Sequence, residues 1–288
     1  MPDIKNVLFP VDLSLPCRSV APFVRALTGH FNAHLTLIHG IAIPPEYSVN
    51  YGGNVSAALR TELRDSSTAS LQAFADQEFG LGSVQRVIEE GDAAEVVAGY
   101  AAKHKIDLIM MPTHGFGPLR RFLLGSVTAK VLHDAQCPVW TSAHTDAPLS
   151  PPSECRTILC ALDSGESSVP LMRWAAWLAG SYQAALKLVH VIPAANETSM
   201  NRGEREECRG YLFCQARDEF ATRTQEAGVG VEVCIRSGDI TASVADTALQ
   251  EKANLLVVGR GHLHRVLGGV RPHSPDIIRE APCPVISV

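Results

Sequence analysis

An internal repeat is the feature that most constrains how this chain can fold. The segment NVLFPVDLS at residues 6–14 matches TILCALDSG at 157–165, and CPVWTS at 137–142 matches CPVISV at 283–288. Further matches lie between these, in the same order and at nearly constant spacing. A long repeat in unchanged order indicates a duplicated domain.

Each copy alternates short apolar runs with longer segments of helical character. In the first copy we expect strands at residues 6–11, 34–41, 84–89, 106–111 and from 139, and helices at 14–30, 55–79, 94–104 and from 125. This alternation produces a parallel sheet that right-handed crossovers cover with helices on both faces. We therefore predict an α/β protein with two tandem Rossmann-like domains, residues 1–143 and 155–288, each with a five-stranded parallel sheet.

The loop and helix after the fourth expected strand have the composition of an anion site. Residues 107–142 are predicted to form a strand, a glycine-containing loop, a helix and a strand. Unpaired N–H groups and the helix dipole both favour an anion at a helix N-terminus. Ligands of parallel sheets bind beyond the carboxyl ends of the strands, where the strand order reverses. We therefore expect this loop and the end of the first strand to flank a binding site.

The same loop resembles a known nucleotide-binding loop. Thr113-His114-Gly115, nine further residues and Gly125-Ser126 resemble the loop of universal stress proteins, written G-x-x-G-x9-G-[ST], and the surrounding RRFLLGSVTAKVLHDAQCPV is also similar. The resemblance implies an adenine nucleotide alpha hydrolase-like fold, ATP as ligand with or without Mg²⁺, and a role in the stress response. One departure is Pro112, which replaces the first Gly and has no N–H to offer a phosphate.

The resemblance also assigns residues to the two ends of the nucleotide. For the nucleoside it implies Pro10, Val11, Asp12 and Gly40. For the ribose and phosphates it implies Met111, Pro112, His114, Gly115, Gly125, Ser126, Val127 and Thr128. Backbone N–H groups of Gly115, Ser126 and Val127 would be donors. The hydroxyls of Ser126 and Thr128 can donate to phosphate or cap the helix.

Simpler structural roles compete with these assignments. Asp12 can be a turn or capping residue after a strand, and Ser126 can be the N-cap of the following helix. His39 and His190 stand at equivalent places in the two copies, flanked by aliphatic residues, and we interpret both as hydrogen-bonded core histidines.

The second copy has a degenerate nucleotide loop. His262 stands where the motif has its second Gly, and Arg271-Pro272 stand where the first copy has Gly125-Ser126. Proline removes a backbone donor at this point. His262, His264 and His273 lack a matching set of carboxylates or thiols, so we do not interpret them as a metal site.

Composition excludes several classes of partner. The net charge of −5 offers no attraction to nucleic acid or to an anionic membrane. No apolar run of about 18 residues suggests a transmembrane helix, and no signal peptide is evident, so we expect a cytoplasmic protein. We interpret Cys17, Cys137, Cys160, Cys234 and Cys283 as small core residues in a reducing compartment.

Two functional hypotheses follow. No Walker A, GxSxG or HExxH signature occurs, so we expect a binding protein and not an enzyme, with any ATP hydrolysis slow and incidental. The first hypothesis is an ATP-binding regulatory protein with nucleotide in the first domain. The alternative, which Pro112 favours, is an interaction scaffold of the same fold that binds no nucleotide.

The resemblance also bears on assembly. Universal stress proteins commonly dimerise through their last strands, which implies that residues 139–141 and 285–287 pair the two halves of this chain. A homodimer of whole chains stays open, and the sequence identifies no protein partner.

Overall fold

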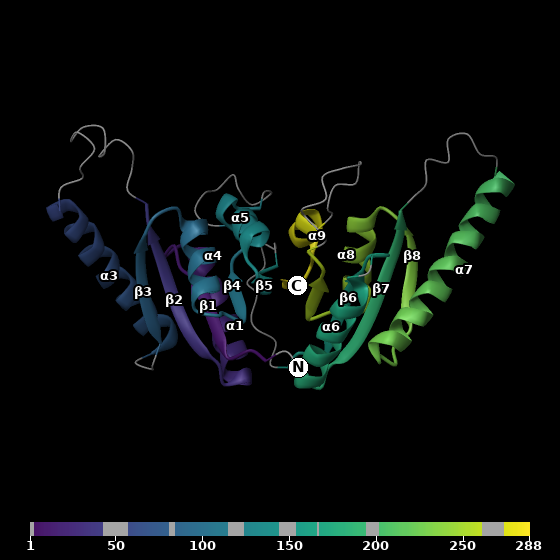
Figure 1. Cartoon of the computed structure of the whole chain (residues 1–288), viewed down its shortest axis with the longest axis horizontal. Coiled ribbons are helices and arrows are strands. Elements are labelled where there is room, and N and C mark those ends of the chain that lie inside the picture. The colour runs from purple at the N-terminus through teal and green to yellow at the C-terminus, as the bar shows by residue number, and fades with distance from the viewer. Residues whose placement is uncertain are drawn as a thin grey trace. The chain divides into compact units, whose positions relative to one another are not determined.

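The computed structural model describes residues 3–42, 57–80, 84–114, 124–143, 154–165, 167–193, 202–260 and 274–288 (Figure 1). They form two compact units, one containing Asp3–Ser142 and the other Pro152–Val288. No helix among these residues is long and apolar enough to cross a membrane.

The described strands of the first unit form a parallel sheet in the order β3-β2-β1-β4-β5. The strands are β1 (Asn6–Pro10), β2 (His34–Ile41), β3 (Gln85–Glu90), β4 (Leu108–Met111) and β5 (Val139–Thr141). The helices are α1 (Leu15–Phe31), α3 (Ala57–Phe79), α4 (Ala93–Lys103) and α5 (Ser126–Asp134). Helix α1 packs against α3, and α4 packs against α5. Right-handed crossovers place these two pairs on opposite faces of the sheet.

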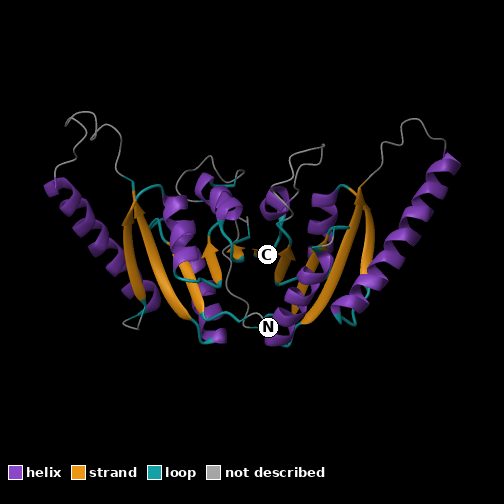
Figure 2. Cartoon of the chain, viewed as in Figure 1, coloured by secondary structure: helices purple, strands orange, loops and turns teal. Residues whose placement is uncertain are grey.

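The second unit repeats this topology, with strands in the order β8-β7-β6-β9-β10. Helices pack on the faces of its sheet, as in the first unit (Figure 2). Its strands are β6 (Thr157–Leu162), β7 (Ala185–Pro193), β8 (Val233–Gly238), β9 (Leu255–Val258) and β10 (Val285–Ser287). Its helices are α6 (Ser168–Tyr182), α7 (Arg202–Ala227), α8 (Ile240–Gln250) and α9 (Ser274–Glu280). The predicted α/β fold with two five-stranded parallel sheets is confirmed.

The local sequence explains where these elements begin. All four residues of β4 are buried, as a central parallel strand covered on both faces requires. Ser14 caps α1 by accepting the N–H of Cys17. Asp92 caps α4 by accepting the N–H groups of Ala94 and Glu95. Such caps satisfy donors that a helix leaves unpaired in its first turn.

His39 and His190 stand at equivalent places in the two units and make equivalent hydrogen bonds. Nδ1 of His39 lies 2.7 Å from the carbonyl oxygen of Val11, and Nδ1 of His190 lies 2.9 Å from that of Leu162. Because a carbonyl only accepts, Nδ1 carries the proton in both rings. The hydrogen bonds are confirmed for both, and each side chain ties the second strand of its unit to the end of the first. The core position is confirmed for His190, which is buried, but not for His39, which is partly exposed and lines the pocket described below.

The interpretation of the cysteines is wrong in one case. Cys17, Cys160 and Cys283 are buried, and Cys137 is partly buried, but Cys234 is exposed. Cys234 lies on β8, the edge strand of its unit, where alternate residues face solvent. The structure describes all eight cysteines and forms no disulfide between them.

Candidate functional site

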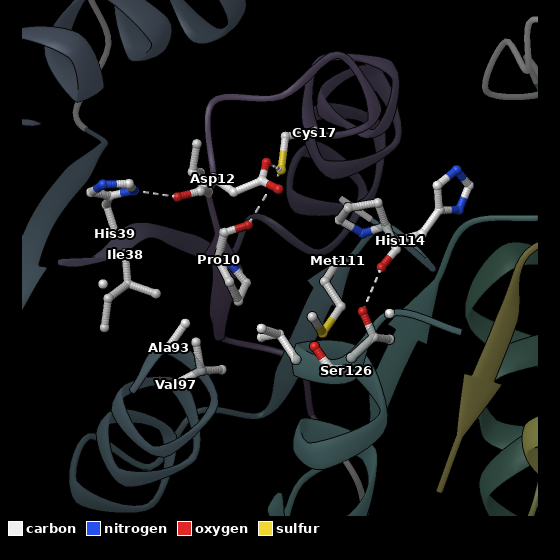
Figure 3. A pocket seen from close by; sticks show the side chains of 16 residues that line it. Pro10, Asp12, Cys17, Ile38, His39, Ala93, Val97, Met111, His114 and Ser126 are labelled. Carbon is white, nitrogen blue, oxygen red and sulfur yellow. Dashed lines mark hydrogen bonds between the residues drawn. The ribbon is translucent and has the colours of Figure 1, made fainter. Parts of the chain in front are cut away.

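A pocket of about 280 Å³ opens in the first unit at the carboxyl ends of β1 and β4 (Figure 3). Its described walls come from β1, β2 and β4, the segments that follow β1 and β4, and the N-terminal parts of α1, α4 and α5. From β1 the chain continues to β2 on one side of β1, and it later returns to form β4 on the other side. The strand order therefore reverses between β1 and β4. Open α/β sheets bind their ligands at such points.

The pocket brings together every predicted site residue that the structure describes. These are Pro10, Val11, Asp12, Gly40, Met111, Pro112, His114, Gly125, Ser126, Val127 and Thr128. Gly115, the remaining predicted residue, lies outside the described residues, as do His262, His264, Pro272 and His273 of the second copy. Among the described residues, no cluster of three or more potential metal ligands occurs.

Five further residues line the pocket and were not predicted as site residues. They are Cys17, Ile38, His39, Ala93 and Val97. Two periodicities could have found three of them. Ile38 shares a strand face with Gly40, because side chains alternate along β2. Ala93 and Val97 are four residues apart, and so lie on one face of α4.

Gly40 shapes the apolar wall by having no side chain. A Cβ on this residue would lie 3.2 Å from the Cα of Ala93. Backbone cannot give way as a flexible side chain can, so glycine is what allows the start of α4 to lie against β2. Ile38, Ala93 and Val97 then form an apolar surface beside this contact, suited to a flat, weakly polar group.

Asp12 combines a turn role with a place in the pocket wall. Its Oδ1 accepts the backbone N–H of Ser14 at 3.0 Å and the thiol of Cys17 at 2.9 Å. The intervening Leu13 has φ of 63°, in the left-handed region that costs a residue with a Cβ on the order of 1 kcal/mol. The turn interpretation and the pocket assignment therefore both describe Asp12.

The start of α5 is built around Gly125. Its N–H donates to the carbonyl of Thr113 at 2.8 Å, and a Cβ on it would lie 3.3 Å from that oxygen and from the Cα of His114. Gly125 is the N-cap, so the alternative that Ser126 caps the helix is wrong. In the part of the chain that the structure describes, no side chain caps this first turn, in contrast to α1 and α4. Its N–H groups stay available to an anion in the pocket.

The hydroxyl of Thr128 has a structural partner. It is buried and donates to the carbonyl of Pro112 at 3.1 Å. In the second unit Ser274 donates to the carbonyl of Gly259 at 3.0 Å, at the equivalent place. The bond recurs in the copy whose nucleotide loop has diverged. Its main effect is therefore to tether the start of the helix to the end of the preceding strand.

His114 supplies a titratable group at the edge of the pocket. Its Nδ1 lies 3.2 Å from the hydroxyl of Thr113. Partial burial lowers the pKa of the imidazole below its usual value, because removal from water disfavours the charged form. Burial therefore favours the neutral form of the ring in the free protein.

Comparison with known proteins decides the family. The sequence profile of the Universal stress protein family matches residues 3–142 and again residues 154–288. The chain belongs to this family. It carries two copies of the family's domain, as the repeat predicts, and the predicted family is confirmed.

Two curated relatives each match about half of this chain. A universal stress protein of Methanocaldococcus jannaschii is 29% identical over 138 residues, which span 47% of this chain and 79% of the relative. Universal stress protein A homolog 2 of Coxiella burnetii is 28% identical over 142 residues, 48% of this chain and 94% of the relative. A crystal structure of a universal stress protein from Archaeoglobus fulgidus matches 99% of this chain and 98% of its own, with 19% identity and a TM-score of 0.68, which supports the fold.

Proposed function

We propose that the first unit binds an adenine nucleotide, ATP, in the pocket at the ends of β1 and β4. The observation that carries this proposal is the uncapped start of α5, which borders a cavity with an apolar opposite wall. A nucleotide matches these two walls, because it has an anionic phosphate end and a flat, weakly polar base.

The pocket residues suit these two ends. The N–H groups of Ser126 and Val127 and the hydroxyl of Ser126 would donate to phosphate oxygens, in charge-assisted hydrogen bonds. Ile38, Ala93 and Val97 would contact the base, and Asp12 would accept a hydrogen bond from the nucleoside. Gly40 and Gly125 would act by allowing close approach of backbone. Mg²⁺, where present, would be held by the phosphates and water.

The described lining residues favour binding over chemistry. They include no lysine or arginine to stabilise charge on a transferring phosphoryl group. Asp12, the one carboxylate among them, accepts two hydrogen bonds at the turn. We therefore propose a nucleotide-binding regulatory protein of the stress response, acting in the cytoplasm, in which any ATP hydrolysis is slow and incidental.

The second candidate function is a scaffold that binds no nucleotide. Pro112 favours it, because this residue lines the pocket without an N–H donor. Pairing of the two halves through residues 139–141 and 285–287, a homodimer of whole chains and a protein partner stay predictions in either case.

Release of bound nucleotide tests the proposal directly. The full chain is purified without added nucleotide and denatured, and the supernatant is analysed by chromatography at 260 nm, with ATP titrated separately by calorimetry. We expect ATP or ADP in the supernatant, or binding of added Mg-ATP. Neither released nucleotide nor binding would favour the scaffold.

A further inference from the structure

The carboxylate of Asp12 is held by one of its two oxygens. Oδ1 accepts both the N–H of Ser14 and the thiol of Cys17, whereas no described residue donates to Oδ2 (Figure 3). Two donors on one oxygen fix the orientation of the carboxylate. They leave the second oxygen as the acceptor available to a ligand in the pocket.

Cys17 is suited to act as a permanent donor. It lies on the first turn of α1 with 1% of its surface exposed. Burial raises the pKa of the thiol, and the neighbouring charge of Asp12 raises it further, so the sulfur stays protonated at neutral pH. The carbonyl of Pro10 is a second acceptor at 3.8 Å, but the single proton favours the nearer, charged carboxylate.

The second unit provides an internal comparison. Asp163 and Ser168 occupy the places of Asp12 and Cys17 in the repeat. Ser168 is equally buried, but it accepts a hydrogen bond at 2.7 Å from Arg223, a residue of α7. Oδ1 of Asp163 instead accepts the N–H of Gly165 at 3.1 Å and the hydroxyl of Ser167 at 3.5 Å. The buried residue of the first turn thus donates to the aspartate in the first unit, through Cys17 and Asp12, whereas Ser168 and Asp163 of the second unit have other partners.

We propose that Cys17 is a positioning residue of the nucleotide site, which orients Asp12 so that its free oxygen accepts a hydrogen bond from the bound nucleoside. The inference rests on the proposed function. The ligand group is a hydrogen-bond donor, either the exocyclic amino group of the base or a ribose hydroxyl. Cys17 also lines the pocket, but we expect its contribution to binding to depend on the carboxylate of Asp12.

The test is a double-mutant cycle on the full chain, read by calorimetry with Mg-ATP. Cys17→Ala removes the donor, Cys17→Ser keeps one, and Asp12→Ala removes the acceptor. We expect Cys17→Ala to weaken binding by about three- to tenfold, which corresponds to the net strength of an ordinary hydrogen bond, because the lost bond orients Asp12 and is not made to the ligand. Cys17→Ser should retain most of the affinity. In the Asp12→Ala background, Cys17→Ala should have no further effect, because the coupled partner is missing.

Controls separate positioning from packing. Cys160→Ala removes an equally buried thiol in the second unit and should leave nucleotide affinity unchanged. Titrations with ITP, which lacks the amino group, and with 2′-deoxy-ATP identify the donor, since the analogue lacking it should not respond to Cys17→Ala. An equal effect of Cys17→Ala with and without Asp12, or no effect, would overturn the positioning role while leaving nucleotide binding intact. A wild-type protein that binds no nucleotide would overturn both proposals.

Discussion

At the scale of single residues, glycine has two different tasks in this pocket. Gly40 allows α4 to lie against β2, and Gly125 allows the start of α5 to lie close to Thr113 and His114. At both positions neighbouring backbone atoms leave little room for a Cβ, and this restriction holds whether or not a ligand is bound. The sequence identified the two positions through the family resemblance, but not the packing contacts that explain them.

We predict that Gly125→Ala weakens nucleotide binding roughly tenfold or more. The new Cβ would lie 3.3 Å from the backbone of Thr113 and His114, so these residues or the start of α5 must shift beside the proposed phosphate position. A misplaced donor loses much of its charge-assisted bond, and about 1.4 kcal/mol corresponds to a tenfold change. Titration calorimetry measures the effect.

The matched control is Gly99→Ala, inside α4. No atom lies within 4 Å of a Cβ placed there. Alanine should therefore leave affinity unchanged and stabilise the helix by about 0.5–1 kcal/mol. Equal nucleotide affinities of the Gly125 and Gly99 variants would contradict the close contact at Gly125.

His114 gives a prediction on pH. Its pKa is lowered in the folded protein, so the unfolded chain takes up its proton first as the pH falls. The contribution of this residue to stability is therefore complete above its unfolded pKa of about 6.5 and declines below it. A phosphate beside the ring would favour the protonated form, so nucleotide affinity should rise as the pH falls through the same interval.

Replacement of His114 by Gln should reduce both trends. Urea unfolding of the free protein and ATP titrations at pH 5.5 and 7.5 provide the measurement. If wild type and variant lose stability equally between these pH values, His114 does not carry the linkage.

At the scale of elements, the position of α5 depends on a few bonds to the end of β4. The N–H of Gly125 and the hydroxyl of Thr128 bind the carbonyls of Thr113 and Pro112. Lys130 also reaches Asp92 and Glu95 on α4, but all three side chains are substantially exposed and such pairs contribute little. The buried tether from Thr128 is therefore the bond to test.

We predict that Thr128→Val destabilises the protein by about 1–2 kcal/mol and weakens ATP binding. Valine keeps the shape but leaves the carbonyl of Pro112 without this donor, which costs about that much in a buried place. Ser274→Ala removes the equivalent bond in the second unit. That variant should lose stability without losing nucleotide affinity. Denaturant unfolding and calorimetry on both variants would show whether the two effects separate, and equal losses of affinity would contradict the assignment of the site to the first unit.

The elements were predictable because their periodicities are strong. Apolar runs such as residues 108–111 and capping residues such as Ser14 and Asp92 fix strand and helix starts by local chemistry. The N-cap of α5 was harder, because Ser is normally preferred to Gly there and the sequence GS allows both. The pocket residues from β2 and α4 needed the sheet order, which brings segments distant in sequence to one edge.

At the scale of the whole molecule, duplication has produced two units with the same topology but different loops after their first strands. In the second unit Arg223 donates to the carbonyls of Ser164 and Gly165 and to Ser168. Its side chain is 19% exposed and also pairs with Glu219. The loop that bears Asp163 is thus fastened to α7, whereas the loop that bears Asp12 is organised around Cys17.

The two copies also differ at the start of their last helix, and this second difference leads to the prediction that each chain binds at most one ATP, in the first unit. Pro272 stands where the first copy has Ser126, so the second copy lacks a backbone donor worth roughly 1.5–3 kcal/mol, or tenfold or more in affinity. Calorimetry on the full chain should give a stoichiometry near one.

Gly125→Glu, which adds negative charge beside the proposed phosphate position, should abolish that binding. Arg223→Ala should leave the stoichiometry unchanged, because releasing the loop does not restore the missing N–H. A stoichiometry of two in wild type, or strong binding that survives Gly125→Glu, would place nucleotide in the second unit and contradict the prediction.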